Sequence, residues 1–210
     1  MLMFVQLTLI LAIPSTLGII GVNVYQKVSQ EQFECLKDKG YEFVIVRTYR
    51  KNGVVDRNSA ITIKNARAAG FTHVDGYLLP CISCGDPSQQ IFTTIDYLKD
   101  ENADIDMLWL DIQGKWYNDT ESNIQFLQDL ILEMTTSGIK HGICTSPFQW
   151  ITIMNNARQF SSESSLWYVR HDNKTTFDNF QMFGGWKQPS IKQYVGSVKE
   201  CGVILDRNFL

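Results

Sequence analysis

Short runs of β-forming residues alternate with helix-forming segments along most of the chain, and this alternation limits the possible folds most strongly. A strand–helix rhythm of this kind is typical of α/β proteins with a parallel sheet. It predicts five strand–helix units, followed by three strands joined by aromatic- and glycine-rich loops. We expect strands near 19–24, 43–49, 73–79, 107–113, 141–145, 166–169, 191–194 and 203–206. The helices between the first six strands should cover approximately 30–39, 57–69, 87–100, 121–137 and 148–156.

Eight strands are enough to close a small α/β barrel, and 210 residues suit one domain with a sizeable core. A doubly wound open sheet is the alternative. No glycine-rich phosphate loop follows the first strand, which argues against a nucleotide-binding fold of that type. The sequence therefore favours an irregular TIM-like barrel formed by residues 19–210.

The fourth predicted strand ends in two polar side chains, Asp111 and Gln113, after the apolar run 107–110. Because side chains alternate across a strand, these two should point the same way, about 7 Å apart. The carboxyl ends of the strands form the mouth of an α/β barrel, where such folds carry their chemistry. A solvated strand end with no chemical role is the alternative.

The N-terminus reads as a targeting segment. Residues 2–13 are apolar and uncharged, and a proline and a small-residue stretch follow at 14–18. This pattern predicts a secretory signal peptide over 1–18, although it has no Lys or Arg near its start. A membrane anchor is less consistent, because the run is shorter than the ~20 residues that span a bilayer. We expect secretion, or delivery to the lumen of a secretory, phagosomal or lysosomal compartment, with no membrane attachment after cleavage.

The chain has five cysteines, which agrees with an oxidising compartment and leaves one of them unpaired within the chain. Cys81 and Cys84 could be half of a zinc site, a redox motif or a local disulfide. No second CxxC or HxxxH completes a metal site, so we expect no metal. Asn118 and Asn173 begin glycosylation sequons. A net charge of −3 gives no basic patch and argues against a nucleic-acid partner.

Polar residues recur inside or at the ends of the predicted strands, and a closed barrel would gather them at one mouth. Carboxylates, amides, phenols and Trp faces together are typical of carbohydrate sites; a satisfied polar barrel end without a ligand is the alternative. Beside Asp111, Gln113, Asn23 and Asp206, the candidates for substrate binding are Arg47, Tyr49, Asp75, Tyr77, Trp167, Tyr168, Trp186, Gln193 and Tyr194. Trp167 and Trp186 would be the flat apolar walls of the cleft.

The chain contains short motifs at 21–24, 33–37, 65–70, 74–77, 80–85, 109–112, 166–168, 183–186 and 206–209. Together these motifs resemble glycoside hydrolase family 25, the muramidases often called Chalaropsis-type lysozymes, and especially its nematode and protist branch. The similarity covers residues 19–210. It implies an irregular β/α barrel of five strand–helix units plus three strands, no cofactor, and cleavage of the β-1,4 bond between N-acetylmuramic acid and N-acetylglucosamine in peptidoglycan. We therefore expect a monomer whose partner is peptidoglycan or a related amino-sugar glycan.

Carried over residue by residue, the family's signature fits this chain only in part. The signature is an Asp near the end of the first strand, an Asp-x-Glu on the fourth, and an Asp on the last. Asp111 and Asp206 match two of these positions. Gln113 stands in place of the general-acid Glu, and Asn23 in place of the first Asp. The resemblance therefore assigns the catalytic positions to Asp111, Gln113, Asp206 and Asn23, with two of the four altered.

These two replacements bear directly on the chemistry. Glycoside hydrolysis needs a carboxylic acid to protonate the leaving oxygen, and an amide has no such proton to give. Loss of a positioned acid costs typically ~10² to 10⁴ in rate. Sugar binding should survive, because the hydrogen-bonding groups remain. We favour weak or absent hydrolysis; the alternative is a non-catalytic carbohydrate-binding or regulatory protein that retains the cleft.

Closure of the barrel also predicts which cysteines pair. The last strand would lie beside the first, so Cys201 could reach Cys35 on the first helix. We expect Cys81 and Cys84 to form a local disulfide. Cys144 would then be a buried thiol in the middle of a strand, with no His placed to activate it.

Overall fold

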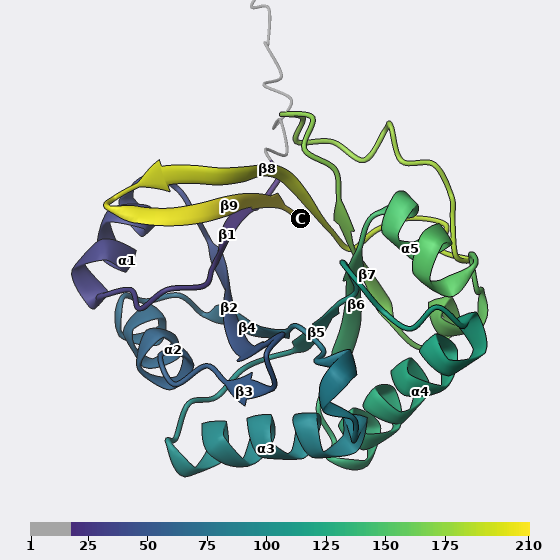
Figure 1. Ribbon diagram of the computed structural model, residues 1–210. Helices are drawn as coiled ribbons and strands as arrows, with labels where there is room; N and C mark the ends of the chain where they lie inside the picture. Colours follow the sequence, from purple (N-terminus) through teal and green to yellow (C-terminus); the bar gives the residue numbers. More distant parts are fainter. Residues whose placement is uncertain (1–17) are drawn as a thin grey trace, which may run out of the picture.

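The computed structural model describes residues 18–210, and its strands form one closed barrel with the helices outside it (Figure 1). Pairing follows the order β1-β9-β8-β7-β6-β5-β4-β2, and a β1–β2 pairing closes the ring. The strands are β1 (Ile20–Val24), β2 (Phe43–Arg50), β4 (His73–Leu78), β5 (Leu108–Asp111), β6 (His141–Thr145), β7 (Ser165–Val169), β8 (Ile191–Glu200) and β9 (Val203–Phe209). A two-residue strand, β3 (Val54–Val55), pairs with the end of β2. The predicted eight-stranded barrel is confirmed, and the open-sheet alternative is wrong.

Five helices follow the first five barrel strands and pack around the outside, as the strand–helix rhythm predicts (Figure 1). The seven barrel strands β1, β2, β4, β5, β6, β7 and β8 pair in parallel with their neighbours in this set, whereas β9 runs antiparallel to both β8 and β1. The carboxyl ends of the parallel strands therefore form one mouth. The helices are α1 (Gln30–Asp38), α2 (Ser59–Ala68), α3 (Pro87–Asp100), α4 (Thr120–Thr136) and α5 (Pro147–Met154).

Local sequence signals account for where several helices begin. Ser29 and Gln32 form a capping box at the start of α1, since each side chain bonds the other's backbone N–H. Asp119 and Ser146 cap α4 and α5 in the same way, by accepting a backbone N–H bond in the first turn. These caps satisfy donors that the first helical turn leaves unpaired.

Large side chains fill the barrel interior, so it is a packed core and not a channel. Two glycines make room for them. A Cβ atom at Gly21 would lie 2.4 Å from the Phe43 ring, and one at Gly142 would lie 2.4 Å from the Trp109 ring. The interior cluster comprises Phe43, Ile45, Tyr77, Trp109, Cys144, Trp167 and Ile191. Two further apolar clusters lie between the barrel wall and the helices.

Both predicted disulfides are present. Cys35 on α1 bonds Cys201 in the turn between β8 and β9, and so ties the two ends of the barrel sequence together. Cys81 bonds Cys84 within the loop that follows β4. Cys144 is a buried free thiol on β6, as expected. Because Cys81 and Cys84 bond each other, they are not half of a zinc site.

The last hairpin is longer than the sequence predicts. We expected strands at 191–194 and 203–206, but β8 and β9 extend to Glu200 and Phe209. The pairing register shifts twice between Gln193 and Val198, in the stretch that contains Gly196 and Ser197. Bulges of this kind break the period-2 alternation on which strand prediction depends.

The signal peptide predicted over 1–18 lies outside the described residues, except for residue 18. Between residues 18 and 210, none of the helices is long and apolar enough to cross a membrane.

Candidate functional site

A network of amides and one carboxylate closes the barrel at the junction of β1, β8 and β9. Asn23 and Asp206 are direct partners in the β1–β9 register, so their side chains meet on the inner face. The Asn23 Nδ2 donates a hydrogen bond to Asp206 Oδ2 at 2.7 Å. Gln193 Nε2 donates to Asn23 Oδ1 at 3.0 Å and lies 3.4 Å from Asp206 Oδ2. Three predicted site residues are therefore brought together here.

Asn208 lies directly beneath this network and fixes its orientation. Its Nδ2 donates to Asn23 Oδ1 at 2.9 Å, and its Oδ1 accepts from Trp167 Nε1 at 2.8 Å. Since Trp Nε1 can only donate, the bonds run in one direction, from Trp167 through Asn208 and Asn23 to Asp206. Our sequence interpretation did not assign Asn208 to the site. The available signal was its spacing, two residues after Asp206 on the same strand face.

The second part of the site is the pair at the end of β5. Gln113 Nε2 donates to Asp111 Oδ2 at 2.6 Å, so the two side chains meet, although the strand predicted over 107–113 is shorter and ends at Asp111. Gln113 is exposed, whereas Asp111 is only 9% exposed. Burial raises the pKa of Asp111 to about 7; the bond from Gln113 opposes this shift, and the charge of Asp206 adds to it. Asp111 is therefore a carboxyl group that can hold a proton near neutral pH.

Tyr77 and Arg47 complete the predicted residues near the mouth. Tyr77 is buried, packs edge-on against Trp167, and lies in the fields of Asp111, Arg47 and Asp206. Burial raises the pKa of its phenol well above the usual value. Arg47 is already engaged at the rim, because its Nε donates to Asp56 at 2.9 Å and a guanidinium NH2 donates to the Tyr25 carbonyl at 2.8 Å.

Two candidates lie too deep to touch a ligand in the cleft. Asp75 is fully buried, accepts a bond from Trp109 Nε1 at 2.8 Å, and lies 3.2 Å from His73 Nε2. Trp167 is 1% exposed and packs inside the barrel, edge-on against Trp109. Both therefore support the floor of the site, and the expectation that Trp167 forms a cleft wall is wrong.

Four further candidates point away from the mouth, and the expectation that they converge there is wrong. Tyr168 and Tyr194 directly follow the inward-facing Trp167 and Gln193, so strand alternation turns them outward. Tyr168 packs on Phe180 in the outer core. Tyr49 comes after a register shift in β2 and also lies in the outer core. Trp186 packs on Trp150 at 4.9 Å between ring centroids, and its Nε1 donates to the Ser164 carbonyl at 2.8 Å.

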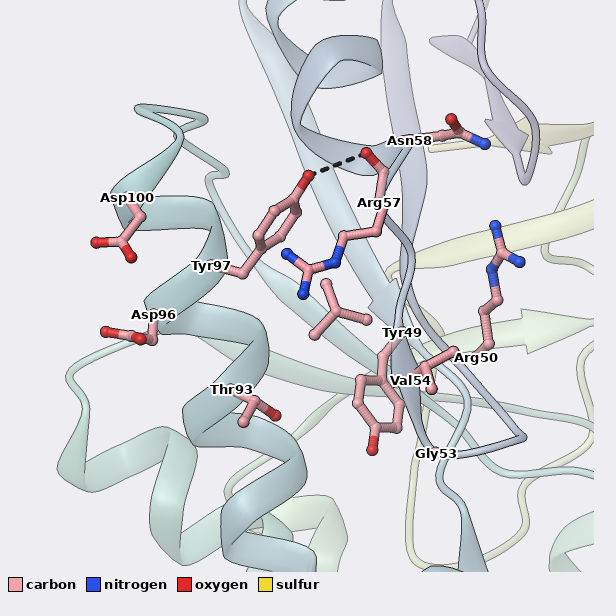
Figure 2. Close-up of a pocket in the computed structure, with 11 residues that line it drawn as sticks. Tyr49, Arg50, Gly53, Val54, Arg57, Asn58, Thr93, Asp96, Tyr97 and Asp100 are labelled. Carbon is pink, nitrogen blue, oxygen red and sulfur yellow. Dashed lines mark hydrogen bonds between the residues drawn. The ribbon is translucent and has the colours of Figure 1, made fainter.

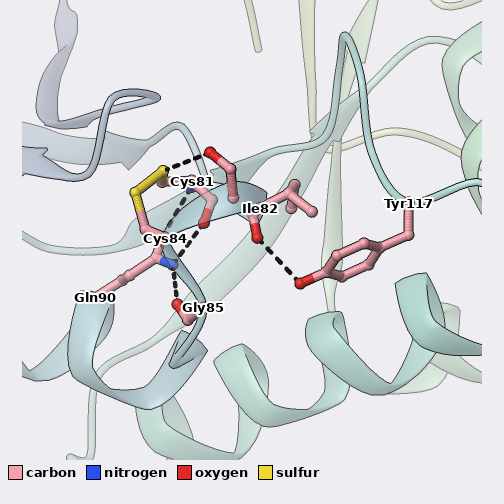
Figure 3. Close-up of a disulfide and its surroundings, with 7 residues drawn as sticks. Cys81, Ile82, Cys84, Gly85, Gln90 and Tyr117 are labelled. Carbon is pink, nitrogen blue, oxygen red and sulfur yellow. Dashed lines mark hydrogen bonds between the residues drawn. A yellow bond between two sulfur atoms is a disulfide. The ribbon is translucent and has the colours of Figure 1, made fainter.

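A cleft of about 610 Å³ opens beside Asp111 and Gln113. Loops that follow β2, β4 and β5 form its walls, and apart from Asp111 and Gln113 none of the lining residues was among the site residues predicted from the sequence. Tyr117 joins two of these loops, because its hydroxyl donates to the Ile82 carbonyl at 3.0 Å beside the Cys81–Cys84 disulfide (Figure 3). The remaining lining residues are Lys51, Leu79, Pro80, Ser83, Gly114, Lys115 and Trp116.

His171, in the loop after β7, extends the hydrogen-bond network to the surface. Its Nε2 lies 2.7 Å from Gln193 Oε1. Since the Gln193 amide nitrogen donates toward Asn23, its oxygen must accept, and the His171 Nε2 carries the proton. This exposed imidazole was also missed, because the loop has no periodicity that would place it.

A separate groove of about 800 Å³ lies outside the barrel, between the β2–β3 turn and α3 (Figure 2). Tyr97 from α3 donates through its hydroxyl to the Arg57 carbonyl at 2.9 Å, and the Arg57 guanidinium lies over the Tyr97 ring. Asp111, Gln113 and Asp206 do not line this groove. We therefore place the candidate active site at the barrel mouth. Within residues 18–210, no group of three or more His, Cys, Asp or Glu side chains could hold a metal ion.

Comparison with known proteins agrees with this geometry. A family model described as lysozyme-like protein 1 matches residues 16–194. The chain is 40% identical over 194 residues to "Probable GH family 25 lysozyme 5" of Dictyostelium discoideum, covering 90% of this chain and 89% of that protein. The chain belongs to glycoside hydrolase family 25. A second relative, "Lysozyme-like protein 5" of Caenorhabditis elegans, is 34% identical over 194 residues, and the match covers 90% of each protein.

The fold of this family 25 member matches solved structures. The muramidase from Acremonium alcalophilum superposes with a TM-score of 0.74 at 15% identity, covering 91% of this chain and 93% of that one. At this identity the likeness shows the fold alone.

Proposed function

We propose that this family 25 chain binds a peptidoglycan-type glycan at the barrel mouth and hydrolyses it weakly or not at all. The observation that carries the proposal is the Gln113 amide, which borders the cleft and donates to Asp111 Oδ2 at 2.6 Å. The family signature has its general-acid Glu at this position. An amide can hold the same hydrogen bonds but cannot protonate a leaving oxygen.

The second altered position supports the same proposal. Asn23 uses its Nδ2 as a donor to Asp206, so a neutral amide replaces a carboxylate beside that group. Both replacements keep the size and hydrogen-bonding capacity of the site while removing ionisable oxygens. A cleft that retains its shape but has lost its acid favours binding over bond cleavage, with a rate loss of about 10²- to 10⁴-fold.

A slow hydrolase is the second candidate, and the state of Asp111 favours it. Burial raises the pKa of Asp111 to about 7, so this carboxyl is protonated in mildly acidic solution. It lies beside the position of the missing acid, and a misplaced acid still retains some catalytic power. Hydrolysis by this route would rise as the pH falls below 7 and would disappear in Asp111→Asn.

We further propose that the protein acts as a monomer after secretion or in a lumenal compartment. The two disulfides support an oxidising environment, and the apolar segment at residues 2–13 supports entry into the secretory route. Expression of the whole chain in a eukaryotic host tests these points. Recovery of the protein from the medium tests secretion, N-terminal sequencing tests cleavage of the signal peptide, and light scattering tests the monomeric state.

Cell-wall cleavage tests the main proposal. The purified protein is incubated with bacterial walls at pH 5 and pH 7.5, while wall binding is measured by co-sedimentation and cleavage by new reducing ends. We expect binding with little cleavage, and at least a 10²-fold gain in cleavage for the double variant Gln113→Glu/Asn23→Asp. Gln125→Glu, on the exposed face of α4, is the matched control. Turnover by the natural protein equal to that of an active muramidase would overturn the proposal.

A further inference from the structure

The cleft beside Gln113 carries positive charge although the whole chain carries a net charge of −3. Lys51, from the β2–β3 turn, and Lys115, from the loop after β5, both line it and are both exposed. Neither ammonium group makes an ion pair or a hydrogen bond with another side chain of residues 18–210. Two cations are therefore available to a ligand in this space.

No fixed negative charge in the cleft neutralises the two lysines. Asp111 is the one carboxyl among the lining residues, and near neutral pH it is partly protonated. Gln113 contributes a neutral amide where the family pattern has a Glu. The replacement that removes the catalytic acid thus also removes an anion from the wall of the cleft, and it leaves the lysines as the dominant charges there.

The cleft also offers a surface for a sugar ring. Tyr117, two residues after Lys115, is 41% exposed, and its bond to the Ile82 carbonyl holds its ring on the wall of the cleft. An aromatic ring with its hydroxyl already bonded suits the apolar face of a pyranose. Charged groups beside such a ring suit acidic substituents of the same sugar.

We propose that Lys51 and Lys115 make the cleft selective for an acidic glycan, by pairing with carboxylates carried on the sugar or on its peptide substituent. This inference rests on the proposed function, since it assumes that the barrel mouth binds an amino-sugar glycan. Exposed ion pairs contribute modestly, so two of them should raise affinity for the acidic ligand about tenfold at low salt. The advantage should shrink as salt screens the charges.

Calorimetric titration of the whole secreted protein tests this inference with three probes. They are neutral chitotetraose, a tetrasaccharide of alternating N-acetylglucosamine and N-acetylmuramic acid, and the same tetrasaccharide bearing its stem peptides. Each is measured in 20 mM and 500 mM NaCl against the natural protein and Lys51→Gln/Lys115→Gln. The matched control, Lys99→Gln/Lys140→Gln, removes the same charge from exposed sites on α3 and beside the amino end of β6.

We expect the cleft double variant to lose about tenfold in affinity for the acidic probes at 20 mM NaCl, with unchanged affinity for chitotetraose. A loss seen with both acidic probes assigns the lysines to the muramic acid carboxylate, and a loss confined to the peptide-bearing probe assigns them to the stem peptide. Equal affinities for natural and variant protein, or an equal loss for neutral and acidic probes, would overturn the inference while leaving glycan binding intact. Failure of the natural protein to bind any probe would overturn the proposed function itself.

Discussion

Asn23 and Asp206 face each other across the β1–β9 pairing, with the amide nitrogen of Asn23 donating to the Asp206 carboxylate at 2.7 Å. The orientation of that amide is fixed from its other side, because Gln193 and Asn208 both donate to Asn23 Oδ1. Rotation of the amide would set oxygen against oxygen and nitrogen against two donors. The surrounding residues are therefore arranged for an uncharged amide at position 23.

Asn23→Asp should consequently make the stability depend on pH. Two carboxyl groups with oxygens 2.7 Å apart share a proton, which raises one pKa in the folded state above its unfolded value. The folded variant then holds a proton that the unfolded chain releases, so its stability falls as the pH rises from about 4 through the raised pKa. We expect the free energy of unfolding of Asn23→Asp, measured in urea, to lie below that of the natural protein by about 1–3 kcal/mol at pH 8 and by much less at pH 5.

Asn118→Asp, at an exposed position outside the network, is the control for this experiment and should change stability little at either pH. If Asn23→Asp lost the same stability at pH 5 and at pH 8, the cause would be the shape and hydrogen bonding of the side chain and not its charge.

Asp111→Asn should stabilise the protein in alkaline solution. Burial raises the folded pKa of Asp111 from 3.8 to about 7, so the folded state keeps a proton that the unfolded state loses between these values. The natural protein therefore loses stability as the pH rises from about 4 to 7, and the neutral Asn removes that loss. We expect the variant to be more stable by about 2–4 kcal/mol at pH 8 and nearly equal at pH 4. Urea titrations across this range measure the difference, with the exposed Asp178→Asn as control.

The architecture followed from the sequence because it depends on periodicity. Alternating strands and helices predicted the barrel. The side chains of Asp111 and Gln113 do meet, although Gln113 lies beyond the end of β5. Closure of the barrel correctly paired Cys35 with Cys201. Each of these inferences needs only the order of the elements and the geometry of a strand.

The errors in the site have equally specific causes. Tyr168 and Tyr194 were grouped with neighbours that face inward, against the alternation that the same reasoning used for Asp111. Periodicity predicts which face of a strand a side chain occupies, but it does not predict how deep along the barrel axis that side chain lies. For this reason Asp75, which is fully buried, was assigned to the mouth. The cleft itself is formed by loop residues such as Lys51 and Tyr117, whose positions no repeating pattern encodes.

The two disulfides should differ in their contribution to stability. Cys35 and Cys201 are separated by 166 residues, whereas Cys81 and Cys84 are separated by 3. In the chain-entropy description, closing the long loop is worth about 5 kcal/mol and closing the short one about 2 kcal/mol. Thermal and urea unfolding of Cys35→Ala/Cys201→Ala and Cys81→Ala/Cys84→Ala measure both values. A larger loss of stability for Cys81→Ala/Cys84→Ala would contradict this ranking. It would mean that the disulfide in the loop beside the cleft stabilises the barrel more than the disulfide between Cys35 and Cys201 does.

Lys192 should be essential for the loop that carries His171. Its side chain is fully buried behind β8, and its Nζ lies 2.9 and 3.0 Å from the two carboxylate oxygens of Asp172 and 3.1 Å from the Thr176 carbonyl. Lys192→Met removes the buried one of the two cations that pair with Asp172, the other being the exposed Arg170 at 3.3 Å. We expect the free energy of unfolding measured in urea to fall by about 2–4 kcal/mol. Because His171 precedes Asp172 directly, the variant should also disturb the hydrogen bond between His171 and Gln193.

The acid dependence of stability separates this ion pair from simple packing. Burial alone would raise the pKa of Asp172, but hydrogen bonds from Lys192, Asn179 and the Lys174 backbone prevail and lower it to about 2. A carboxylate with a lowered folded pKa contributes stability that is complete above about pH 4 and is lost as the pH falls toward 2. The natural protein should show this decline, and Lys192→Met should show much less of it. Adding Asp172→Asn to Lys192→Met should recover part of the lost stability, because it removes a carboxylate that has lost its buried cation and keeps only the exposed Arg170. Strict additivity of the two single losses would argue that Lys192 and Asp172 do not act as a unit.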